Sequence, residues 1–378
     1  MKKIYTSSLA ILTFLFTMGL DGRVAADQNP SKTAPKNANL RIGVIGDTGI
    51  GERAFHWGFL AVQKALRESR PDVLLHLGDF VYQPKFQPQT CPTKYIREIR
   101  ETLVDPYPFR LFVPGDNDLP SHIRKPKASG CWNHIDLLDT PFDGNSGPNE
   151  DPPRFEGTKT IGNTFFAILN TYPWKDPTSW LAPKIKAAKD KGLWIIVALH
   201  EPAITTAWYL NKRDTVLKQL NALKPDLVFS GNQHSYERFH PLGIPRKGEK
   251  LPVHKSQSFT YQRGQGTIHI ISGGGGATFK PFADQQGYKD RTAPEDVFDA
   301  LAKRALMNHY IILEVSAKVL KGTTYRVCPG SDPTGKSDTR WKANKPMWEN
   351  ITLECTGKPE GVKKFDQFEI LREDPSGK

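Results

Sequence analysis

Residues 41–49 of the chain read RIGVIGDTG, and residues 73–82 read VLLHLGDFVY. Each stretch is a short apolar run that continues into Gly-Asp, and a helix-like segment separates the two. Short apolar runs that alternate with helical segments are typical of an α/β sheet. Polar residues directly after such strands lie at the strand ends, where α/β proteins bind their ligands. The two stretches therefore predict both an α/β fold and the place of a site.

The same alternation continues along the chain. We expect strands at 40–45, 72–77, 109–113, 164–170, 193–199, 227–230, 267–271 and 308–315, and helices at 52–69, 93–104, 177–191 and 213–223. Residues 281–306 are expected to form a mobile loop and a helix, and residues 139–155 a long surface loop. The pattern predicts one domain over 40–378, with a β-rich C-terminal extension from about residue 309.

The composition is that of an ordinary globular protein. The chain has 378 residues, of which 38% are hydrophobic and 24% charged, and this excludes a disordered or fibrous protein. A formal net charge of +12 disfavours basic partners. The basic residues form no clustered stripe and no known module, so we expect no dedicated nucleic-acid binding. The oligomeric state stays open.

The N-terminal segment is typical of a cleavable export signal. Lys2 and Lys3 precede an apolar run, and small residues stand just before Asp27. The run is shorter than the roughly 20 residues that span a bilayer, so we expect no transmembrane segment after cleavage. We therefore predict a signal peptide at 1–26, a linker at 27–39 and a secreted or periplasmic protein, with an uncleaved anchor as the alternative.

Four cysteines are too few for a disulfide scaffold, and no Cys-x-x-Cys pair indicates a structural zinc site or a redox motif. A metal site would therefore use His, Asp, Asn or Tyr. Export makes the cysteines candidates for disulfides. We expect the pairs that close local loops, Cys91 with Cys131 and Cys328 with Cys355, while the other two pairings stay possible.

Three further polar blocks follow predicted strands. They are GDND at 115–118, VALH at 197–200 and GNQHSYER at 231–238. A single Gly-Asp after a strand is usually a turn in which Asp accepts a hydrogen bond from a nearby backbone amide. Five blocks that each place Asp, Asn, His or Tyr after a strand are hard to explain as turns. Oxygen and nitrogen ligands of these kinds suit two hard or borderline metal ions.

The five blocks resemble the motifs Gly-Asp-x-Gly, Gly-Asp-x-x-Tyr, Gly-Asn-His-Asp/Glu, Val-x-x-His and Gly-His-x-His. These motifs belong to the calcineurin-like metallophosphoesterases, and within them to the purple acid phosphatases. The resemblance covers residues 40 to 280, approximately. It implies a four-layer sandwich of two mixed β-sheets flanked by helices, with a dinuclear site between the sheets. It also implies hydrolysis of phosphorylated small molecules by attack of a metal-bound hydroxide.

The resemblance assigns ligands to both ions when it is carried over position by position. The first ion would be held by Asp47, Tyr82 and His234, the second by Asp116, His200 and Asn232, and both by Asp79. The implied catalytic residues are Asp79, Asn117 and His200. Gly49 stands where most of the superfamily has His, which makes Tyr82 the replacement ligand. Because a phenolate prefers a ferric ion, we expect iron at the Tyr82 site.

Three positions around the second ion depart from the family pattern. Asp116 stands where the family has Asn, and Asn117 and Asn232 stand where it has His. These exchanges make the second site richer in oxygen, which shifts the expected ion from zinc toward manganese, ferrous iron, magnesium or calcium.

An amide at position 117 cannot act as a general acid, and for a poor leaving group this loss costs about 10² to 10⁴ in rate. The chain therefore favours anhydrides or aryl esters over alkyl monoesters, unless another group substitutes for the missing His. His122, His134 and His240 are the candidates, although each is more commonly an ordinary surface or core histidine.

Two other functions stay open at this point. One is a phosphodiesterase or nucleotide phosphohydrolase, and the other is a catalytically silent relative that binds metal and a phosphorylated or acidic partner. Aromatic residues in the expected loops could stack on a nucleoside or aryl group, although packing within the protein is their more common role. These residues are Trp132, Trp174, Trp208 and Tyr209.

Overall fold

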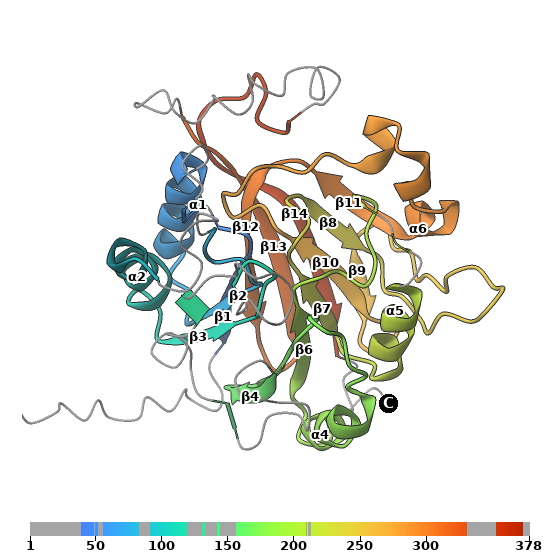
Figure 1. Ribbon diagram of the computed structural model, residues 1–378. Helices are drawn as coiled ribbons and strands as arrows, with labels where there is room; N and C mark the ends of the chain where they lie inside the picture. Colours follow the sequence, from blue (N-terminus) through green and yellow to red (C-terminus); the bar gives the residue numbers. More distant parts are fainter. Residues whose placement is uncertain are drawn as a thin grey trace, which may run out of the picture. The chain divides into compact units, whose positions relative to one another are not determined.

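A computed structural model of the chain describes residues 39–48, 50–51, 56–82, 91–118, 131–132, 142–143, 156–208, 210, 213–330 and 353–372 (Figure 1). The predicted signal peptide and all of the predicted linker except Asn39 lie outside these residues, as does Gly49. Within the described ranges, no helix has the length and apolar character that a membrane crossing needs.

Two mixed sheets of seven strands each form the centre of the described structure (Figure 1). The strands of the first sheet are β1 (Leu40–Ile45), β2 (Val73–His76), β3 (Phe109–Phe112), β9 (Thr260–Gln262), β12 (Asn308–Val315), β13 (Val319–Cys328) and β14 (Gly361–Leu371). Their order is β3-β2-β1-β12-β13-β14-β9. β1, β2 and β3 are parallel to one another, whereas β12, β13 and β14 continue the sheet in antiparallel pairs.

The second sheet has a parallel centre with antiparallel edges. Its strands are β4 (Gly157–Ile161), β5 (Thr164–Leu169), β6 (Trp194–Leu199), β7 (Leu227–Ser230), β8 (Tyr236–Phe239), β10 (Ile268–Ser272) and β11 (Leu301–Ala305). Their order is β11-β8-β10-β7-β6-β5-β4. β5, β6, β7 and β10 are parallel, and β4, β8 and β11 pair antiparallel with their neighbours.

Helices cover the outer faces of both sheets. They are α1 (His56–Glu68), α2 (Thr93–Ile99), α4 (Thr178–Asp190), α5 (Arg213–Ala222) and α6 (Glu295–Ala300), with a π-helical turn η1 (Arg100–Val104) and the 3₁₀ turns η3 (Ala283–Gln286) and η4 (Lys289–Arg291). Phe59 of α1 packs in one buried cluster with Leu74 of the first sheet, and Leu181 of α4 packs in another with Val197 of the second. The predicted four-layer α/β sandwich is therefore confirmed.

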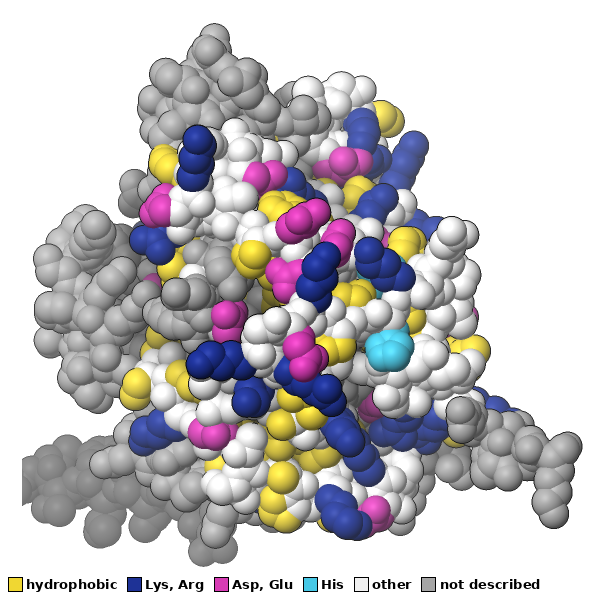
Figure 2. Space-filling model, turned by 90° about the vertical axis from the view of Figure 1, so that its right-hand side faces the viewer, with side chains coloured by type: hydrophobic (Ala, Val, Ile, Leu, Met, Phe, Trp, Pro, Cys, Tyr) yellow, Lys and Arg dark blue, Asp and Glu magenta, His cyan; other side chains and the backbone are white. Residues whose placement is uncertain are grey.

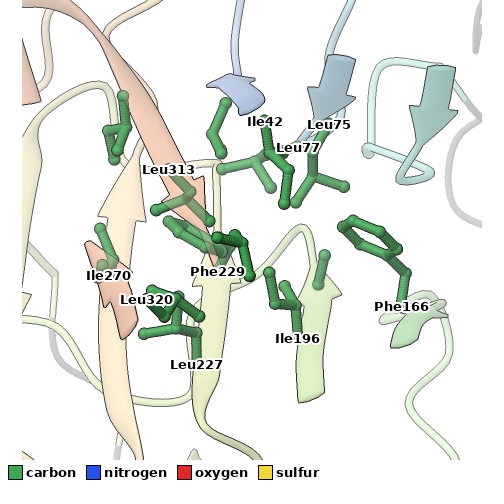
Figure 3. Packing of buried hydrophobic residues seen from close by; sticks show 14 of the residues in the cluster. Ile42, Leu75, Leu77, Phe166, Ile196, Leu227, Phe229, Ile270, Leu313 and Leu320 are labelled. Atoms are coloured by element: carbon green, nitrogen blue, oxygen red, sulfur yellow. The ribbon is translucent and has the colours of Figure 1, made fainter. Parts of the chain in front are cut away.

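A third buried cluster fills the space between the sheets. Figure 3 shows Ile42, Leu75 and Leu313 of the first sheet directed toward Ile196 and Phe229 of the second. β2, β5, β6 and β7 are buried at every position because one face meets the other sheet and the opposite face meets helices. Strands covered on both faces need nearly continuous apolar sequence, which explains why they could be found as apolar runs.

The predicted elements agree with the structure in the parallel part of both sheets and in the antiparallel strand β12. The strands expected at 227–230 and 308–315 occupy the same residues. The expected helix at 93–104 is α2 continued by the π-helical turn η1. The long loop expected at 139–155 lies outside the described residues, except for residues 142–143.

Six strands were not placed individually: β4, β8, β9 and β11, which lie at or near sheet edges, and β13 and β14, which form part of the C-terminal stretch that was expected only to be rich in β structure. β8 reads YERF, and its two charged residues are fully buried, so no apolar pattern marks it as a strand. In the stretch 281–306, the helix α6 covers only six residues, and β11 follows it directly. The strand forms because β11 pairs with β8, a contact that local sequence does not reveal.

All four cysteines form disulfides, and the two expected pairs are confirmed. Cys91 is bonded to Cys131, and Cys328 is bonded to Cys355.

The face shown in Figure 2 carries charged side chains of both signs, with Asp and Glu lying among Lys and Arg. On this face, Lys and Arg side chains are more numerous in the lower half of the view, where a few Asp and Glu side chains lie among them.

A buried ion pair joins the two sheets. Arg238 of β8 donates from Nε and Nη2 to the two carboxylate oxygens of Asp366 in β14, at 2.7 and 2.9 Å. The hydroxyl of Tyr236 also donates to Asp366, at 2.7 Å, and the guanidinium lies 4.4 Å from the ring centre of Phe259. Neither charge has an alternative partner in water, because the Arg238 side chain is fully buried and Asp366 is 6% exposed.

We expect Asp366→Asn to destabilise the protein by about 3 to 5 kcal/mol, because it leaves the Arg238 charge buried without a counter-charge. Urea unfolding measures the effect. The matched control is Asp190→Asn, which breaks the exposed pair with Lys186 and should cost about 0.5 kcal/mol or less. Equal stability of the two variants would contradict the importance of the buried pair.

Candidate functional site

The five polar blocks meet at one edge of the two sheets. Asp47 follows β1, Asp79 follows β2, Asp116 and Asn117 follow β3, His200 follows β6, and Asn232 and His234 follow β7. Because β1–β3 are parallel to one another, as are β6 and β7, their carboxyl ends share an edge within each sheet. The sheets are joined there by a hydrogen bond of 2.7 Å between His200 Nδ1 and the carbonyl oxygen of Leu77.

One group of side chains contains Asp47, Asp79 and His234, whose ligand atoms lie within 4.8 Å of one another. His234 Nε2 is 3.2 Å from Asp47 Oδ1. The Tyr82 hydroxyl lies 3.3 Å from the same oxygen and 3.1 Å from His234 Nε2. His234 Nδ1 contacts the carbonyl oxygen of Thr278, which indicates that Nδ1 carries the proton and Nε2 faces the carboxylates. The structure thus brings together all four residues predicted for the first ion.

A second group contains Asp79, Asp116 and His200. His200 Nε2 is buried, lies 3.5 Å from Asp79 Oδ1 and 3.5 Å from Asp116 Oδ1, and has no hydrogen-bond partner among the described residues. Because Nδ1 donates to the carbonyl of Leu77, the lone pair of Nε2 faces two carboxylate oxygens. Acceptors that converge in this way need a cation between them, so this donor set fits a metal ion.

The electrostatics of the second group agree with this interpretation. Burial lowers the pKa of His200, but the charge of Asp79, the close contacts of Nε2 with Asp116 and Asp79, and the charge of Asp47 outweigh burial and raise the pKa well above its ordinary value. Burial likewise raises the pKa of Asp79, but His200 and the hydrogen bonds from Asn117 hold that pKa below its ordinary value. The group therefore attracts positive charge, which a proton or a metal ion can supply.

Asp79 belongs to both groups, as expected of a bridging ligand. Its two oxygens accept hydrogen bonds from the backbone nitrogen and the side-chain Nδ2 of Asn117, at 2.8 and 2.6 Å. The amide of Asn117 is therefore directed at the carboxylate that both groups share.

Asn232 lies next to these groups, but its amide has other partners. Its backbone nitrogen donates to Asp47 Oδ2 at 2.9 Å. Its side-chain Nδ2 lies 3.5 Å from the Tyr172 hydroxyl, and its Oδ1 lies 3.3 Å from Lys280 Nζ. Tyr172 and Lys280 were not predicted, because neither belongs to the five blocks from which the ligands were assigned.

Asp118 is a further residue that the ligand assignment omitted. Its carboxylate is fully buried and accepts hydrogen bonds from the backbone nitrogens of Asp79, Phe80 and Gly115, at 2.6, 3.1 and 3.0 Å. Burial, followed by the charge of Asp79, raises its pKa well above the ordinary value. Asp118 ties the turn after β3 to the turn that carries Asp79. The sequence feature that could have identified Asp118 is its position as the last residue of the GDND block.

The candidate residues also sit on strained backbone. Asp47, Asp79 and Asn232 have φ angles of 54°, 52° and 62°. Residues other than glycine rarely adopt positive φ, and such residues gather at functional sites where the surrounding structure holds them in place. Two hydrogen bonds donated by backbone nitrogens hold these turns together: Asp47 N donates to the carbonyl oxygen of Gly78, and Asn232 N donates to the side-chain Oδ2 of Asp47.

Among the histidines considered as substitutes for the missing general acid, His240 lies within the described residues, and its ring has a partner away from this site. His240 Nδ1 is hydrogen-bonded to the Tyr261 hydroxyl at 2.7 Å, close to the Arg238 ion pair. His122 and His134 lie outside the described residues.

Residues 40–236 match the sequence profile of the calcineurin-like phosphoesterases, which is 197 of the 378 residues. The chain belongs to this family. The resemblance seen in the five blocks is thus confirmed, and acid phosphatase relatives support the purple acid phosphatase-like branch.

An acid phosphatase of Aspergillus ficuum is 26% identical over 39% of this chain and 25% of its own length. A probable inactive purple acid phosphatase of Arabidopsis thaliana is 23% identical over 74% of this chain and 50% of its own length. The structure of a purple acid phosphatase from yellow lupin (Lupinus luteus) seeds has the same fold, with a TM-score of 0.56 and 15% identity over 90% of this chain and 55% of that protein. The chain thus spans a quarter to a half of the length of these curated relatives.

A substitution at Gly78 tests whether close packing against His200 supports metal binding. Its φ is +92°, and a Cβ at this position would lie 2.5 Å from His200 Nδ1. We expect Gly78→Ala to displace His200 and weaken metal binding about 10-fold or more, as changes to groups that orient metal ligands do. Calorimetric titration with Mn²⁺ measures this.

The matched control for this variant is Gly248→Ala. Gly248 has a similar φ of +80°, but a Cβ at this position would have no neighbouring atom within 4 Å. Both variants strain the backbone, and only Gly78→Ala crowds the candidate ligands. Equal Mn²⁺ affinity of the two variants would show that Gly78 does not support the site.

Proposed function

We propose that this protein is an exported, metal-dependent phosphoric ester hydrolase with a dinuclear site. The observation that carries the proposal is the convergence of side chains from five strand ends into two groups that share Asp79. Family membership and the acid phosphatase relatives support the same reaction class. The substrate we propose is a phosphorylated small molecule.

In this proposal the first ion is held by Asp47, Asp79, Tyr82 and His234, and the second by Asp79, Asp116, His200 and Asn232. When bound, the two ions would polarise a phosphoryl oxygen and lower the pKa of coordinated water. The phenol of Tyr82 beside two carboxylates favours iron in the first site. The oxygen-rich second set favours manganese, iron, magnesium or calcium over zinc.

The remaining polar groups orient these ligands. Hydrogen bonds to the carbonyl oxygens of Leu77 and Thr278 fix the rings of His200 and His234, so that each directs Nε2 toward the carboxylates. The two hydrogen bonds from Asn117 fix the orientation of Asp79, while Asp118 holds the turn on which Asp79 lies.

The position of Asn117 bears on the choice of substrate. Its Nδ2 donates to Asp79, and an amide cannot deliver a proton to a leaving group. We therefore propose that the enzyme acts on esters or anhydrides whose leaving group needs little protonation.

A catalytically silent relative remains the alternative from another functional class. Asn117 and Asn232 favour it, because each stands where the family has His. Such a protein would bind metal and phosphate without turnover.

Export is supported by the disulfides, which take up all four cysteines of the chain. Disulfides persist in oxidising compartments and are rare in the cytosol. We therefore propose that the protein works in the periplasm or after secretion.

We expect the mature protein, reconstituted with iron or manganese, to hydrolyse p-nitrophenyl phosphate. Asp79→Asn should reduce kcat/KM by about 100-fold or more, because it weakens the carboxylate that both ligand groups share. Asp190→Asn, which alters an exposed carboxylate on α4, is the control and should leave the rate unchanged. Bound metal without turnover would favour the silent relative, and stoichiometric zinc after purification without added metal would contradict the assignment of the second site.

We expect kcat/KM for p-nitrophenyl phosphate to exceed that for glycerol phosphate by about 10² to 10⁴, because the alkyl leaving group lacks a proton donor. Asn117→His should reduce this ratio of kcat/KM values, because it supplies an imidazole that can protonate the leaving group. Equal turnover of the two substrates by the wild-type protein would show that another group protonates the leaving group.

A further inference from the structure

Lys280 places a positive charge beside the proposed second metal site. Its Nζ donates to the backbone oxygen of Asn232 at 2.6 Å and lies 3.3 Å from the side-chain Oδ1 of the same residue. Both partners are uncharged oxygens, and within the described residues the exposed Lys280 forms no ion pair with a carboxylate. The ammonium therefore carries a charge that no neighbouring acidic group neutralises.

The segment that leads to Lys280 is tied to the first ligand group. The nitrogen of Ala277 donates to the carbonyl oxygen of Asp47 at 3.0 Å, and the carbonyl oxygen of Thr278 contacts His234 Nδ1. These contacts lie three and two residues before Lys280, so its backbone cannot leave the site without breaking them. The position of Lys280 is therefore set by the contacts that orient a proposed metal ligand.

The amide of Asn232 offers a single oxygen to both the ammonium and a metal ion. Its Nδ2 lies 3.5 Å from the hydroxyl of Tyr172, whose ring centre is 6.1 Å from that of His200. Its Oδ1 is therefore the side-chain atom left to accept from Lys280 or to bind an ion. Hard cations lie about 2.0 to 2.6 Å from oxygen ligands. An ion on Oδ1 and the ammonium would thus be at most about 6 Å apart.

Two cations at this separation repel each other, because the distance is shorter than the Debye length of about 8 to 10 Å at physiological salt. The carboxylates of the second group are those of Asp116 and Asp79, and Asp79 also belongs to the first group. They bring two negative charges at most, whereas a divalent ion and the ammonium bring three positive charges. An anion that lies beside both cations removes this excess.

We propose that Lys280 weakens binding of the second ion, and that a phosphate group next to both cations restores it. The proposal rests on the dinuclear phosphoesterase function proposed above, with Asn232 as a ligand, and adds how that site is loaded. Phosphate raises the affinity for the second ion, and by thermodynamic linkage the ion raises the affinity for phosphate by the same factor. The protein then holds one ion tightly and completes its site when an anionic substrate is present.

The test is a calorimetric titration of the metal-depleted mature protein with Mn²⁺, with and without inorganic phosphate. For the wild-type protein we expect one tight and one weak binding step, and phosphate should strengthen the weak step about 10-fold or more. Lys280→Met keeps a long side chain and removes its charge. Without phosphate, this variant should bind the second ion about 5-fold more tightly or better, and the effect of phosphate should be smaller.

The direction of this change separates an effect of charge from a structural role. If Lys280 only held Asn232 in place, Lys280→Met would weaken the second binding step, and that result would overturn the proposal. Lys280→Arg keeps the charge and should behave as the wild-type protein. The matched control is Lys186→Met, which removes a lysine of α4 whose side chain is 77% exposed, and it should leave both steps unchanged.

The proposal also fails if phosphate does not strengthen the second step, or if the wild-type protein and Lys280→Met bind the second ion equally well. Turnover of p-nitrophenyl phosphate together with either result would leave the phosphoesterase function intact. Phosphate-dependent binding of the second ion without turnover of any substrate would support the coupling and reject the hydrolase. Binding of a single ion with and without phosphate would reject both the coupling and the dinuclear site.

Discussion

Buried negative charge is the constraint on which the rest of the site depends. Asp47 and Asp79 are fully buried at the edge where the two sheets meet. An ionised carboxylate without partners is costly in such a place. The surrounding structure supplies three kinds of partner for these carboxylates. They are backbone nitrogens, the side-chain amide of Asn117, and the imidazoles of His200 and His234. Both imidazoles direct a ring nitrogen toward these carboxylates, an arrangement that becomes favourable when a cation lies between them.

The sandwich makes this arrangement possible because each sheet contributes one half of it. Asp79 comes from the first sheet and His200 from the second, and neither could bind an ion in this way alone. The sheets are fixed against each other by the apolar layer between them and by the ion pair of Arg238 with Asp366. Arg238 lies four residues after His234 on the same segment, so the packing of the sheets and the position of a ligand are coupled through β8.

The residues at which this chain departs from the family pattern change the chemical groups around the proposed second ion. With Asn at 117 and 232, the site has fewer groups that transfer protons and more that accept or donate fixed hydrogen bonds. Asn232 receives hydrogen bonds from Lys280 at its backbone and side-chain oxygens, so a positive charge lies beside the residue that stands where the family has His.

The sequence by itself determined the parallel core of both sheets and the blocks that follow its strands. Those strands are buried on both faces, so they read as continuous apolar runs, and Asp79, His200 and His234 could be placed at their ends without coordinates. Comparison of the blocks with a known family then ordered these residues into two ligand sets. The local pairing of the cysteines was also predicted correctly, because each pair closes a short loop.

Only the tertiary structure decided the contacts that join segments far apart in the chain. β8 is a strand despite its Glu and Arg, because Asp366 and Thr206 lie opposite these charges in the folded chain. The direction of the Asn117 amide, the approach of Lys280 to Asn232 and the contact of Trp208 with Tyr288 depend on loops meeting in space. Local sequence does not reveal these contacts, because the partner of a polar or aromatic side chain is determined by tertiary packing and not by its neighbours along the chain.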